Sequence, residues 1–380
     1  MKMQIGLDGN EANVKNRVGS GVYALELLKE FSKDKNHQFL VYLKEKSLPD
    51  LPKESANFTY KVFGPKKLWT QFALSLKLFF GKKPDIFFSM GHYGPRFSKV
   101  PYVITIHDLS YLHYPQMFKK NDLYQLVNWT KYSVKTAAHI VTVSETTKKD
   151  IIENYSLDPS KITVTYEGYD KSRFKPQPKS KIESVKKKYK IAGDYIIFVG
   201  TLQPRKNIER LVDAFSLLTQ NSELKTQDLS LVLVGKKGWL YDSIFAKIKT
   251  LDVDNQVIFT DYVPDDDLPV LIAGAKAYVL PSLWEGFGLP VIEAQACGVT
   301  VVVSSISSLP EIVGDSGILA DPKSVESISN GLKKVLMDDK LRSELVKKGF
   351  ANIKRFSWQT CAQQTLDVLE KVALTSKPIV

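Results

Sequence analysis

Two glutamates stand on either side of a glycine-rich turn in residues 281–293, which read PSLWEGFGLPVIE. Gly286 and Gly288 have no side chain, so the backbone of this turn can come close to a ligand. A proline follows at position 290, where it suits the first turn of a helix. The amides around Phe287 and Leu289 would then lie at a helix N-terminus and face an anion.

The two carboxylates of this segment suit the hydroxyl groups of a sugar nucleotide. Glu285, before the turn, can accept hydrogen bonds from sugar hydroxyls. Glu293, placed by this pattern in the first helical turn, can reach a ribose diol. The alternative is a surface loop in which an acid near the helix start only favours the helix dipole.

A second segment, residues 195–215, predicts a strand, a basic loop and a helix. The apolar run YIIFV ends at Gly200 and is followed by TLQPRKN, after which apolar residues recur at helical spacing. Asn207 is the predicted N-cap, so Arg205 and Lys206 would lie beside a helix N-terminus. Arg205 can bind two phosphate oxygens and Lys206 adds a point charge, which suits a diphosphate. Because the chain has 53 lysines and arginines, this hypothesis depends on their position directly after a strand-ending glycine.

Together the two segments resemble the retaining glycosyltransferases of family 4, which have the GT-B fold. The resemblance extends over nearly the whole chain, and the order and spacing of its landmarks are harder to mimic than a single motif. The combination of GTLQPRKN with HDLS is most similar to the branch that contains polysaccharide mannosyltransferases. The matching landmarks, in chain order, are residues 19–21, 107–110, 143–145, 200–207 and 285–293.

The resemblance implies an enzyme that moves a hexose from a nucleotide sugar to a hydroxyl of a glycan or lipid-linked acceptor, with retention of the anomeric configuration. It implies mannose from GDP-mannose, with glucose or another hexose from a UDP-sugar as the alternative. No carboxylate stands out as a covalent nucleophile, so we expect front-face attack. Two alternatives from other classes stay open: an NAD-dependent oxidoreductase and a non-catalytic module that binds sugar nucleotides.

The oxidoreductase alternative depends on the glycines before the first predicted helix. Gly19, Gly21 and Ala24 partly match the dinucleotide fingerprint, with Glu45 as the ribose-binding acid. The fingerprint should follow its strand immediately, whereas residues 9–18 intervene here. In the transferase hypothesis, the amides near Gly21 close over the donor phosphate or the acceptor. For Gly19 alone, a flexible loop ahead of a helix is the alternative.

His107 follows the strand-like residues 102–106 and so lies at the carboxyl end of a predicted strand. A histidine in such a place is usually structural. The resemblance reverses this interpretation, because the family's histidine that contacts the transferred sugar falls on this position. Arg205 and Lys206 would stabilise the charge that grows on the leaving diphosphate, as a divalent metal does in other transferases. The predicted catalytic residues are therefore His107, Glu285, Arg205 and Lys206.

The remaining predicted contacts are with the donor substrate. The nucleotide base is expected near Gly235, Tyr262 and Val263, at the ends of strands in the second half of the chain. The predicted substrate-binding residues are Gly19, Gly21, Gly200, Gly235, Tyr262, Val263, Gly286, Phe287, Gly288, Leu289 and Glu293.

We expect no metal ion, and no cofactor besides the donor itself. The three aspartates at 265–267 could suggest a metal-binding Asp-x-Asp motif. Their position between Pro264 and Leu268 fits a helix N-cap better. The histidines show no metal-ligand spacing.

Short apolar runs alternate with helical patterns, which predicts an α/β fold with doubly wound parallel sheets. The basic, proline-bearing residues 171–190 interrupt the rhythm and predict a linker. The resemblance implies two Rossmann-like domains that face each other across a cleft, with ligands beyond the carboxyl ends of the strands. The predicted domains are residues 1–173, with a helix over 357–380 that packs back on them, and a donor domain over 174–356. The predicted strands are residues 3–8, 39–43, 85–89, 102–106 and 140–143, then 196–199, 229–234, 256–259, 277–280 and 300–303.

Composition agrees with two ordinary domains in a reducing compartment. A chain of 380 residues with 43% hydrophobic content suffices for two cores. Cys297 and Cys361 are the only cysteines, too few for a disulfide framework, which predicts a cytoplasmic protein. No apolar run approaches the roughly 18 residues needed to cross a bilayer, and the start of the chain leads into a strand rather than a signal peptide.

The formal net charge of +12 leaves nucleic acid, anionic membrane and phosphorylated substrates open as partners. The basic surplus is larger in the first predicted domain, which should hold the acceptor. There, residues 66–83 pair an apolar helical face with flanking lysines, as an interfacial helix does. We therefore expect no nucleic acid, and peripheral contact with the inner face of the cell membrane is one interpretation. A core-packed helix with lysines at its ends is the other.

Overall fold

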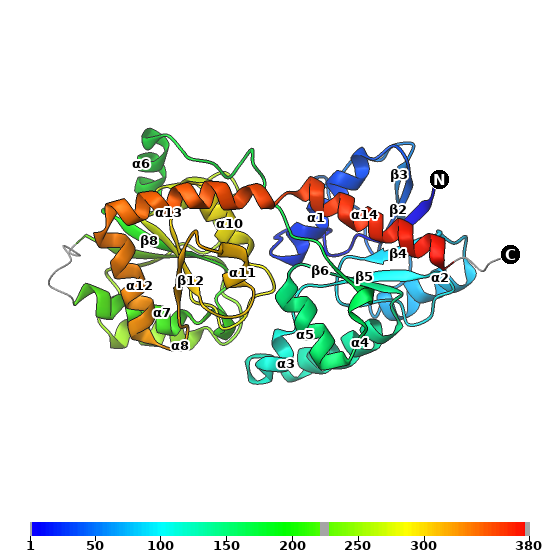
Figure 1. Ribbon diagram of the computed structural model, residues 1–380, viewed down its shortest axis with the longest axis horizontal. Coiled ribbons are helices and arrows are strands. Elements are labelled where there is room, and N and C mark those ends of the chain that lie inside the picture. Colours follow the sequence, from blue (N-terminus) through cyan, green and yellow to red (C-terminus); the bar gives the residue numbers. More distant parts are fainter. Residues whose placement is uncertain (1, 221–227, 377–380) are drawn as a thin grey trace. The chain divides into compact units, whose positions relative to one another are not determined.

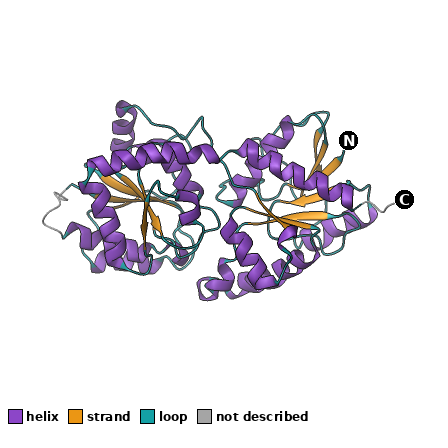
Figure 2. Ribbon diagram, viewed as in Figure 1, coloured by secondary structure: helices purple, strands orange, loops and turns teal. Residues whose placement is uncertain are grey.

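The computed structural model describes residues 2–220 and 228–376, which form two compact units. Unit 1 comprises Met1–Gly168 and Phe356–Val380, and unit 2 comprises Tyr169–Arg355. The sequence placed these boundaries after residues 173 and 356, and residues 377–380 of the predicted last helix lie outside the described residues. Each unit is a parallel sheet with helices on its faces (Figure 1 and Figure 2).

Within the described residues, unit 1 has a seven-stranded sheet of order β3-β2-β1-β4-β5-β6-β7, in which all neighbours are parallel. The central strands β4, β5 and β6 are buried along their whole length, as expected for a parallel sheet covered on both faces. The strands are β1 (Gln4–Asp8), β2 (Gln38–Leu43), β3 (Phe58–Val62), β4 (Ile86–Ser89), β5 (Tyr102–Ile106), β6 (His139–Thr142) and β7 (Ile162–Val164).

The last helix of the chain belongs to unit 1. It packs against the first helix and against β4 and β6, so segments from the two ends of the chain lie side by side (Figure 1). Its N-cap is Ser357, whose hydroxyl accepts a hydrogen bond from the Thr360 amide. The helices of unit 1 are α1 (Ser20–Lys33), a π-helical turn (Thr70–Leu74), α2 (Ser75–Phe80), α3 (Ser110–His113), α4 (Lys120–Thr136), α5 (Glu145–Tyr155) and α14 (Trp358–Thr375), with 3-10 turns at Pro115–Met117 and Pro159–Lys161.

Unit 2 has a parallel sheet of order β10-β9-β8-β11-β12-β13 in its described part. The strands are β8 (Tyr195–Val199), β9 (Ser230–Val234), β10 (Val257–Phe259), β11 (Ala277–Leu280), β12 (Val301–Ser304) and β13 (Ile318–Ala320). The helices are α6 (Lys179–Lys188), α7 (Ile208–Thr219), α8 (Asp242–Thr250), α9 (Leu268–Ala273), α10 (Leu289–Ala296), α11 (Leu309–Val313), α12 (Val325–Met337) and α13 (Asp339–Asn352), with 3-10 turns at Pro204–Lys206 and Ile353–Arg355. Helix α7 packs with α8 and α12, whereas α10 packs with α9, α11 and α13.

The ten predicted strands are present, but three short strands were not predicted. Strands β7 and β13 have only three residues each, and β3 is a half-exposed strand at one edge of its sheet. The predicted linker at 171–190 was wrong in part, because it contains α6. That helix buries only Val185 among its ten residues, five of which are lysines, so its sequence lacks the apolar stripe by which helices are recognised.

Candidate active site

The residues that follow three neighbouring strands of unit 2 are in backbone contact with one another. A Cβ atom on Gly235, after β9, would lie 2.1 Å from the carbonyl oxygen of Gly200, after β8, so only glycine fits. The Gly235 amide also donates a hydrogen bond of 3.0 Å to the carbonyl oxygen of Asp261, after β10. Tyr262, half-exposed, and Val263, buried, follow directly. The residues predicted to lie near the nucleotide base are therefore gathered at one edge of the sheet.

The basic loop after β8 is fixed to the end of β11. Its residues Pro204–Lys206 form a 3-10 turn, and Asn207 follows in the left-handed conformation with φ of 60°. The Asn207 side-chain amide donates to the carbonyl oxygens of Pro281 (2.9 Å) and Pro322 (2.7 Å). Asn207 is the N-cap residue of α7, as predicted, but its side chain makes no capping hydrogen bond and instead ties three segments together.

The structure joins Glu285 to both predicted phosphate-binding cations. Lys206 Nζ lies 2.6 Å from Glu285 Oε1, and Arg205 Nη1 lies 3.2 Å from Oε2 and also donates to the carbonyl oxygen of Trp284. The three side chains are only 8–15% exposed. We name Arg205, Lys206 and Glu285 the charge cluster. From the sequence, the two cations were predicted to bind phosphate and Glu285 to bind sugar hydroxyls. In the structure, the three side chains form one set of ion pairs.

Electrostatics keeps Glu285 ionised within the charge cluster. Burial alone would raise the pKa of Glu285, but attraction to Lys206 and Arg205 outweighs burial and holds that pKa below its ordinary value. Two cations and one carboxylate leave a single net positive charge. A diphosphate would be attracted to this charge, and it would compete with Glu285 for the same donors.

Two serines after β12 position the loop that carries Glu285. The Ser307 hydroxyl accepts a hydrogen bond of 2.9 Å from the Glu285 amide and donates to the carbonyl oxygen of the same residue. Ser308 Oγ lies 2.9 Å from the carbonyl oxygen of Glu285 and 3.1 Å from that of Phe287. Sequence reasoning missed both serines, because their segment SSISS has no spacing that distinguishes a buried clamp from a polar loop.

The glycine turn leads into α10 as predicted, with one correction. Gly288 has φ of 105°, and a Cβ there would lie 2.8 Å from Leu309 Cδ2, so a side chain would be strained and crowded. Helix α10 begins at Leu289, which puts Glu293 in its second turn rather than its first. Burial raises the pKa of Tyr278 in β11 well above its ordinary value, and the charges of Glu285 and Glu293 raise it further. Both carboxylates are thus close to one buried phenol.

In unit 1, His107 follows β5 and is held from several sides. Its Nε2 atom lies 3.1 Å from the carbonyl oxygen of Met90, and its Nδ1 atom lies 3.8 Å from Oε1 of the buried Glu167. Its backbone amide donates to His92 Nε2 (3.1 Å), and its carbonyl oxygen accepts from Thr147 Oγ1 (3.2 Å). His107 is therefore fixed in both ring and backbone.

Glu167 changes the protonation behaviour of this site. Burial alone would lower the pKa of His107, but the neighbouring Glu167 carboxylate raises it above its ordinary value. Burial, together with the nearby His107, lowers the pKa of His92 to about 4, so His92 is neutral and accepts the His107 amide. Sequence reasoning missed Glu167, because it follows β7, a strand that was not predicted.

Gly19 and Gly21 lie at the start of α1, and Gly21 lies beside Glu11, an acid that was not among the predicted site residues. The Gly21 amide donates to the carbonyl oxygen of Val18 (3.0 Å), so this amide is used within the turn. A Cβ on Gly21 would lie 3.1 Å from the Glu11 carbonyl oxygen, and Ser20 Oγ donates to Glu11 Oε2 (3.0 Å). Gly19 has φ of 46° and open space where a side chain would stand.

The three aspartates near α9 make surface contacts. Asp265 pairs with Arg173 at 3.1 Å, and Asp267 accepts from Lys188 Nζ (2.5 Å) and from the Tyr189 hydroxyl (2.8 Å). Asp267 is the N-cap residue of α9, as predicted from the sequence, but its side chain makes no capping hydrogen bond to that helix. In the part of the chain that the structure describes, no three His, Cys, Asp or Glu side chains are grouped as metal ligands.

Comparison with known proteins identifies the family. Residues 18–173 match the family model described as Glycosyltransferase Family 4, and residues 181–351 match the model described as Glycosyl transferases group 1. The chain is 36% identical over 282 residues to O-antigen chain mannosyltransferase B from Escherichia coli, which covers 73% of each chain. It is 30% identical over 232 residues to O-antigen chain mannosyltransferase RfbU from Salmonella typhimurium, covering 61% of this chain and 60% of that protein.

Solved structures share the fold at low sequence identity. Sucrose-phosphate synthase from Thermosynechococcus elongatus has a TM-score of 0.76 at 17% identity, covering 99% of this chain and 100% of that one. The Anabaena protein HepE, solved with UDP and glucose, has a TM-score of 0.75 at 19% identity, covering 97% and 100%. The chain therefore belongs to glycosyltransferase family 4, near its mannosyltransferase branch, and is a nucleotide-sugar-dependent hexosyltransferase of the GT-B fold.

Proposed function

We propose that the enzyme transfers mannose from GDP-mannose to a hydroxyl of a glycan or lipid-linked acceptor. The names of its relatives support mannose, since O-antigen chain mannosyltransferase B aligns over 73% of this chain. A UDP-hexose is the alternative donor, because the HepE fold was solved with UDP and glucose. Both donors carry a diphosphate, so the same binding elements in unit 2 serve either one.

The observation that carries this proposal is the charge cluster after β8. Arg205 and Lys206 bind the diphosphate of the donor and stabilise the negative charge that develops as the sugar leaves. Their positive charges are fixed before the donor arrives, because Asn207 anchors their loop and Glu285 holds both side chains. Two protein cations can thus take the place of a divalent metal, and we propose that transfer needs no metal ion.

Glu285 and Glu293 bind hydroxyl groups in this proposal, Glu285 on the transferred sugar and Glu293 on the ribose. Glu285 is a poor nucleophile, because both of its oxygens face cations. We propose that transfer retains the anomeric configuration, and of the two retaining routes this arrangement favours front-face attack by the acceptor hydroxyl over a covalent intermediate. The base is proposed to lie by Gly235 and Tyr262, and His107 in unit 1 is proposed to contact a sugar substrate.

A donor panel tests this proposal directly. GDP-mannose, UDP-glucose, UDP-N-acetylglucosamine and NAD are compared in a thermal-shift assay, and the stabilising donor is then offered with candidate acceptors in the presence of EDTA. We expect stabilisation by GDP-mannose, turnover that survives the chelator, and an axial anomeric linkage by NMR. Stabilisation by a UDP-sugar alone would replace the donor, and an inverted product or a strict requirement for metal would contradict the mechanism.

A further inference from the structure

The helical segment between β3 and β4 is anchored to unit 1 by one face. Trp69 is 3% exposed, and its indole Nε1 donates to the carbonyl oxygen of Phe63 at 2.8 Å. Ala73, Leu74 and Leu78 continue this face along the π-helical turn and α2, and they are part of the buried core of the unit. One side of the helical segment is therefore fully occupied by ordinary core packing.

The opposite face of the segment is also apolar, but it is exposed. Leu68, Phe72, Leu76 and Phe80 recur every fourth residue and are 43%, 55%, 53% and 77% exposed. We name these four side chains the apolar stripe. A surface helix of a globular protein is normally polar on its outer face, and a helix that is apolar on both faces is normally covered on both. Of the predicted helix over residues 66–83, the structure forms helical turns over residues 70–80. The Trp69 side chain just before them is buried in unit 1.

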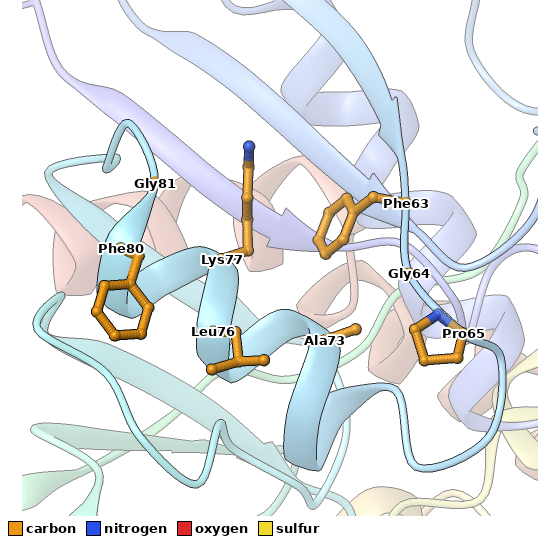
Figure 3. A pocket seen from close by; sticks show the side chains of 8 residues that line it. All are labelled: Phe63, Gly64, Pro65, Ala73, Leu76, Lys77, Phe80 and Gly81. Atoms are coloured by element: carbon orange, nitrogen blue, oxygen red, sulfur yellow. The ribbon is translucent and has the colours of Figure 1, made fainter.

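A shallow groove runs beside the apolar stripe. It has a volume of about 520 Å³ and lies between the chain that leaves β3 and the outer face of α2 (Figure 3). The Lys77 side chain extends along it, and Leu76 and Phe80 stand at the helix side (Figure 3). The groove-lining residues are Phe63, Gly64, Pro65, Ala73, Leu76, Lys77, Phe80 and Gly81, seven of which offer no charged group.

Exposed lysines flank the stripe along the sequence, and acids are absent from this stretch of sequence. Residues 61–84 contain six lysines and no Asp or Glu. All six lysines are exposed, and only Lys66 has an ion-pair partner in the described salt bridges, Glu45 at 3.0 Å. Lys99 adds another cation, 4.3 Å from the centre of the Phe79 ring. The lysines of this stretch are Lys61, Lys66, Lys67, Lys77, Lys82 and Lys83.

We infer that this face of unit 1 docks on an anionic lipid bilayer. The apolar stripe would enter the boundary between headgroups and acyl chains, lipid hydrocarbon would fill the groove, and the lysines would bind lipid phosphates. A second copy of the chain fits less well, because a symmetric contact would bring the two sets of lysines together. No helix in residues 2–220 or 228–376 has the length and apolar content to span a bilayer, so this contact would be interfacial.

Vesicle sedimentation tests the inference with the full-length enzyme. Wild-type protein is mixed with vesicles of phosphatidylcholine alone or with added phosphatidylglycerol, at low and high salt. We expect binding to the anionic vesicles that weakens with salt. Phe72→Ser, Leu76→Ser and Phe80→Ser together should reduce this binding about tenfold or more, because they remove the inserted apolar area. Lys82→Ser with Lys83→Ser should reduce it by a similar factor through lost charge.

Matched controls distinguish binding through this face from non-specific hydrophobic or electrostatic binding. Tyr124→Ser changes a side chain of α4 that is 66% exposed, and Lys179→Ser with Lys181→Ser removes two exposed cations from α6. Both controls should bind vesicles as the wild type does. Sedimentation velocity without lipid is run on every variant. Equal vesicle binding by wild type and the stripe variant, or a wild-type dimer that the stripe variant abolishes, would overturn the inference. This test is independent of donor binding and turnover.

Discussion

At the scale of single residues, the site is organised by charge. Glu285 is ionised in a nearly buried position because Lys206 and Arg205 neutralise it. The same contact holds the two cations in place. Binding of a diphosphate therefore loses less conformational entropy, because two long side chains are already ordered. In unit 1, a second buried carboxylate, Glu167, lies beside His107 and raises the pKa of that histidine.

Replacing Arg205 should slow transfer rather than unfold the protein. In Arg205→Ala, the developing charge on the diphosphate loses one of its donors, so kcat/KM should fall by about 30- to 1000-fold, on the order of 2–4 kcal/mol. Steady-state kinetics with the donor that stabilises the enzyme measures this. Lys249→Ala, an exposed cation on α8, serves as the control and should leave kcat/KM unchanged. An unaltered kcat/KM in Arg205→Ala would remove it from the mechanism.

Replacing Glu285 should separate nucleotide binding from turnover. Glu285→Gln keeps the size of the side chain but removes the negative charge beside both cations, so the nucleoside diphosphate alone should bind several-fold more tightly. The kcat should fall, because the transferred sugar loses a charged acceptor, and the free protein should be less stable, because two largely buried cations lose their carboxylate partner. Isothermal titration with GDP and UDP, beside kinetics, measures both effects. Weaker diphosphate binding by the variant would mean that Glu285 mainly orders the loop.

Replacing Glu167 should change how the protein responds to pH. The raised pKa of His107 means that its protonated form stabilises the fold below its unfolded pKa, and this contribution is lost as the pH rises through the folded pKa. Glu167→Gln removes the cause of the shift, so the His107 pKa measured by NMR should fall. The stability loss should be larger at about pH 5.5 than at about pH 8.5.

The pair formed by His113 and Asp150 provides a control for this prediction. His113 Nε2 lies 2.7 Å from Asp150 Oδ1, so Asp150→Asn also removes a carboxylate from beside a histidine of unit 1. It should leave the His107 titration in place. If both variants, or neither, move the His107 pKa, the charge of Glu167 is not what sets it.

At the scale of elements, the ends of parallel strands position the chemistry. Strands β8, β9 and β10 are followed by Gly200, Gly235 and Asp261, which are joined through backbone contacts of their loops. The loop after β8 then reaches the end of β11 through Asn207. Because neighbouring parallel strands end at one edge of the sheet, short loops suffice to bring their residues together.

Asn207 offers a test of how far this anchoring matters. Asn207→Gly keeps the left-handed backbone accessible but removes the hydrogen bonds to Pro281 and Pro322, which should cost about 1–3 kcal/mol through the unsatisfied carbonyls. Asn207→Ala should cost more, because alanine is strained at φ of 60°. Urea unfolding of unit 2 measures both. Equal stabilities of the alanine and glycine variants would show that the backbone conformation contributes little.

At the scale of the whole molecule, unit 1 is built from two separate parts of the chain. Helix α14 packs on α1, β4 and β6, so the core of this unit is complete only when the C-terminal segment is present. Unit 2 is formed by the single stretch Tyr169–Arg355. A destabilising substitution in α14 is therefore expected to lower the stability of unit 1, most of which is distant in sequence. It should leave the stability of unit 2, the neighbouring stretch of sequence, unchanged.

Two leucines of α14 test this arrangement. Leu369 is fully buried and Leu374 is 58% exposed. Leu369→Ala should cost about 2–5 kcal/mol through lost burial and the cavity left behind. Leu374→Ala should change stability by less than about 0.5 kcal/mol. Hydrogen exchange should show the loss in residues 2–168 and not in residues 169–355. Faster exchange in unit 2 would mean that α14 supports the other unit.

The sequence alone predicted ten of the thirteen described strands, the last helix and the family, because each depends on local periodicity or on short motifs in a fixed order. It could not predict partners that only folding brings together. Lys206 and Arg205 are 79 and 80 positions from Glu285 in the sequence. Glu167 follows a three-residue strand, and no motif around it distinguishes it from other acidic residues. Local sequence patterns predict that a residue lies at the end of a strand. Which side chain it contacts there is decided by how the sheet packs.

The tertiary structure likewise decided which face of the segment before β4 is covered. Its sequence is apolar on both sides, so periodicity could not choose between a core helix and an interfacial one. Packing of Trp69 and Leu74 on unit 1 places one face in the core and leaves Phe80 on the other face exposed. Sequence fixes the composition of a helix surface, but only contact with the rest of the fold decides which part of that surface is left to meet water or lipid.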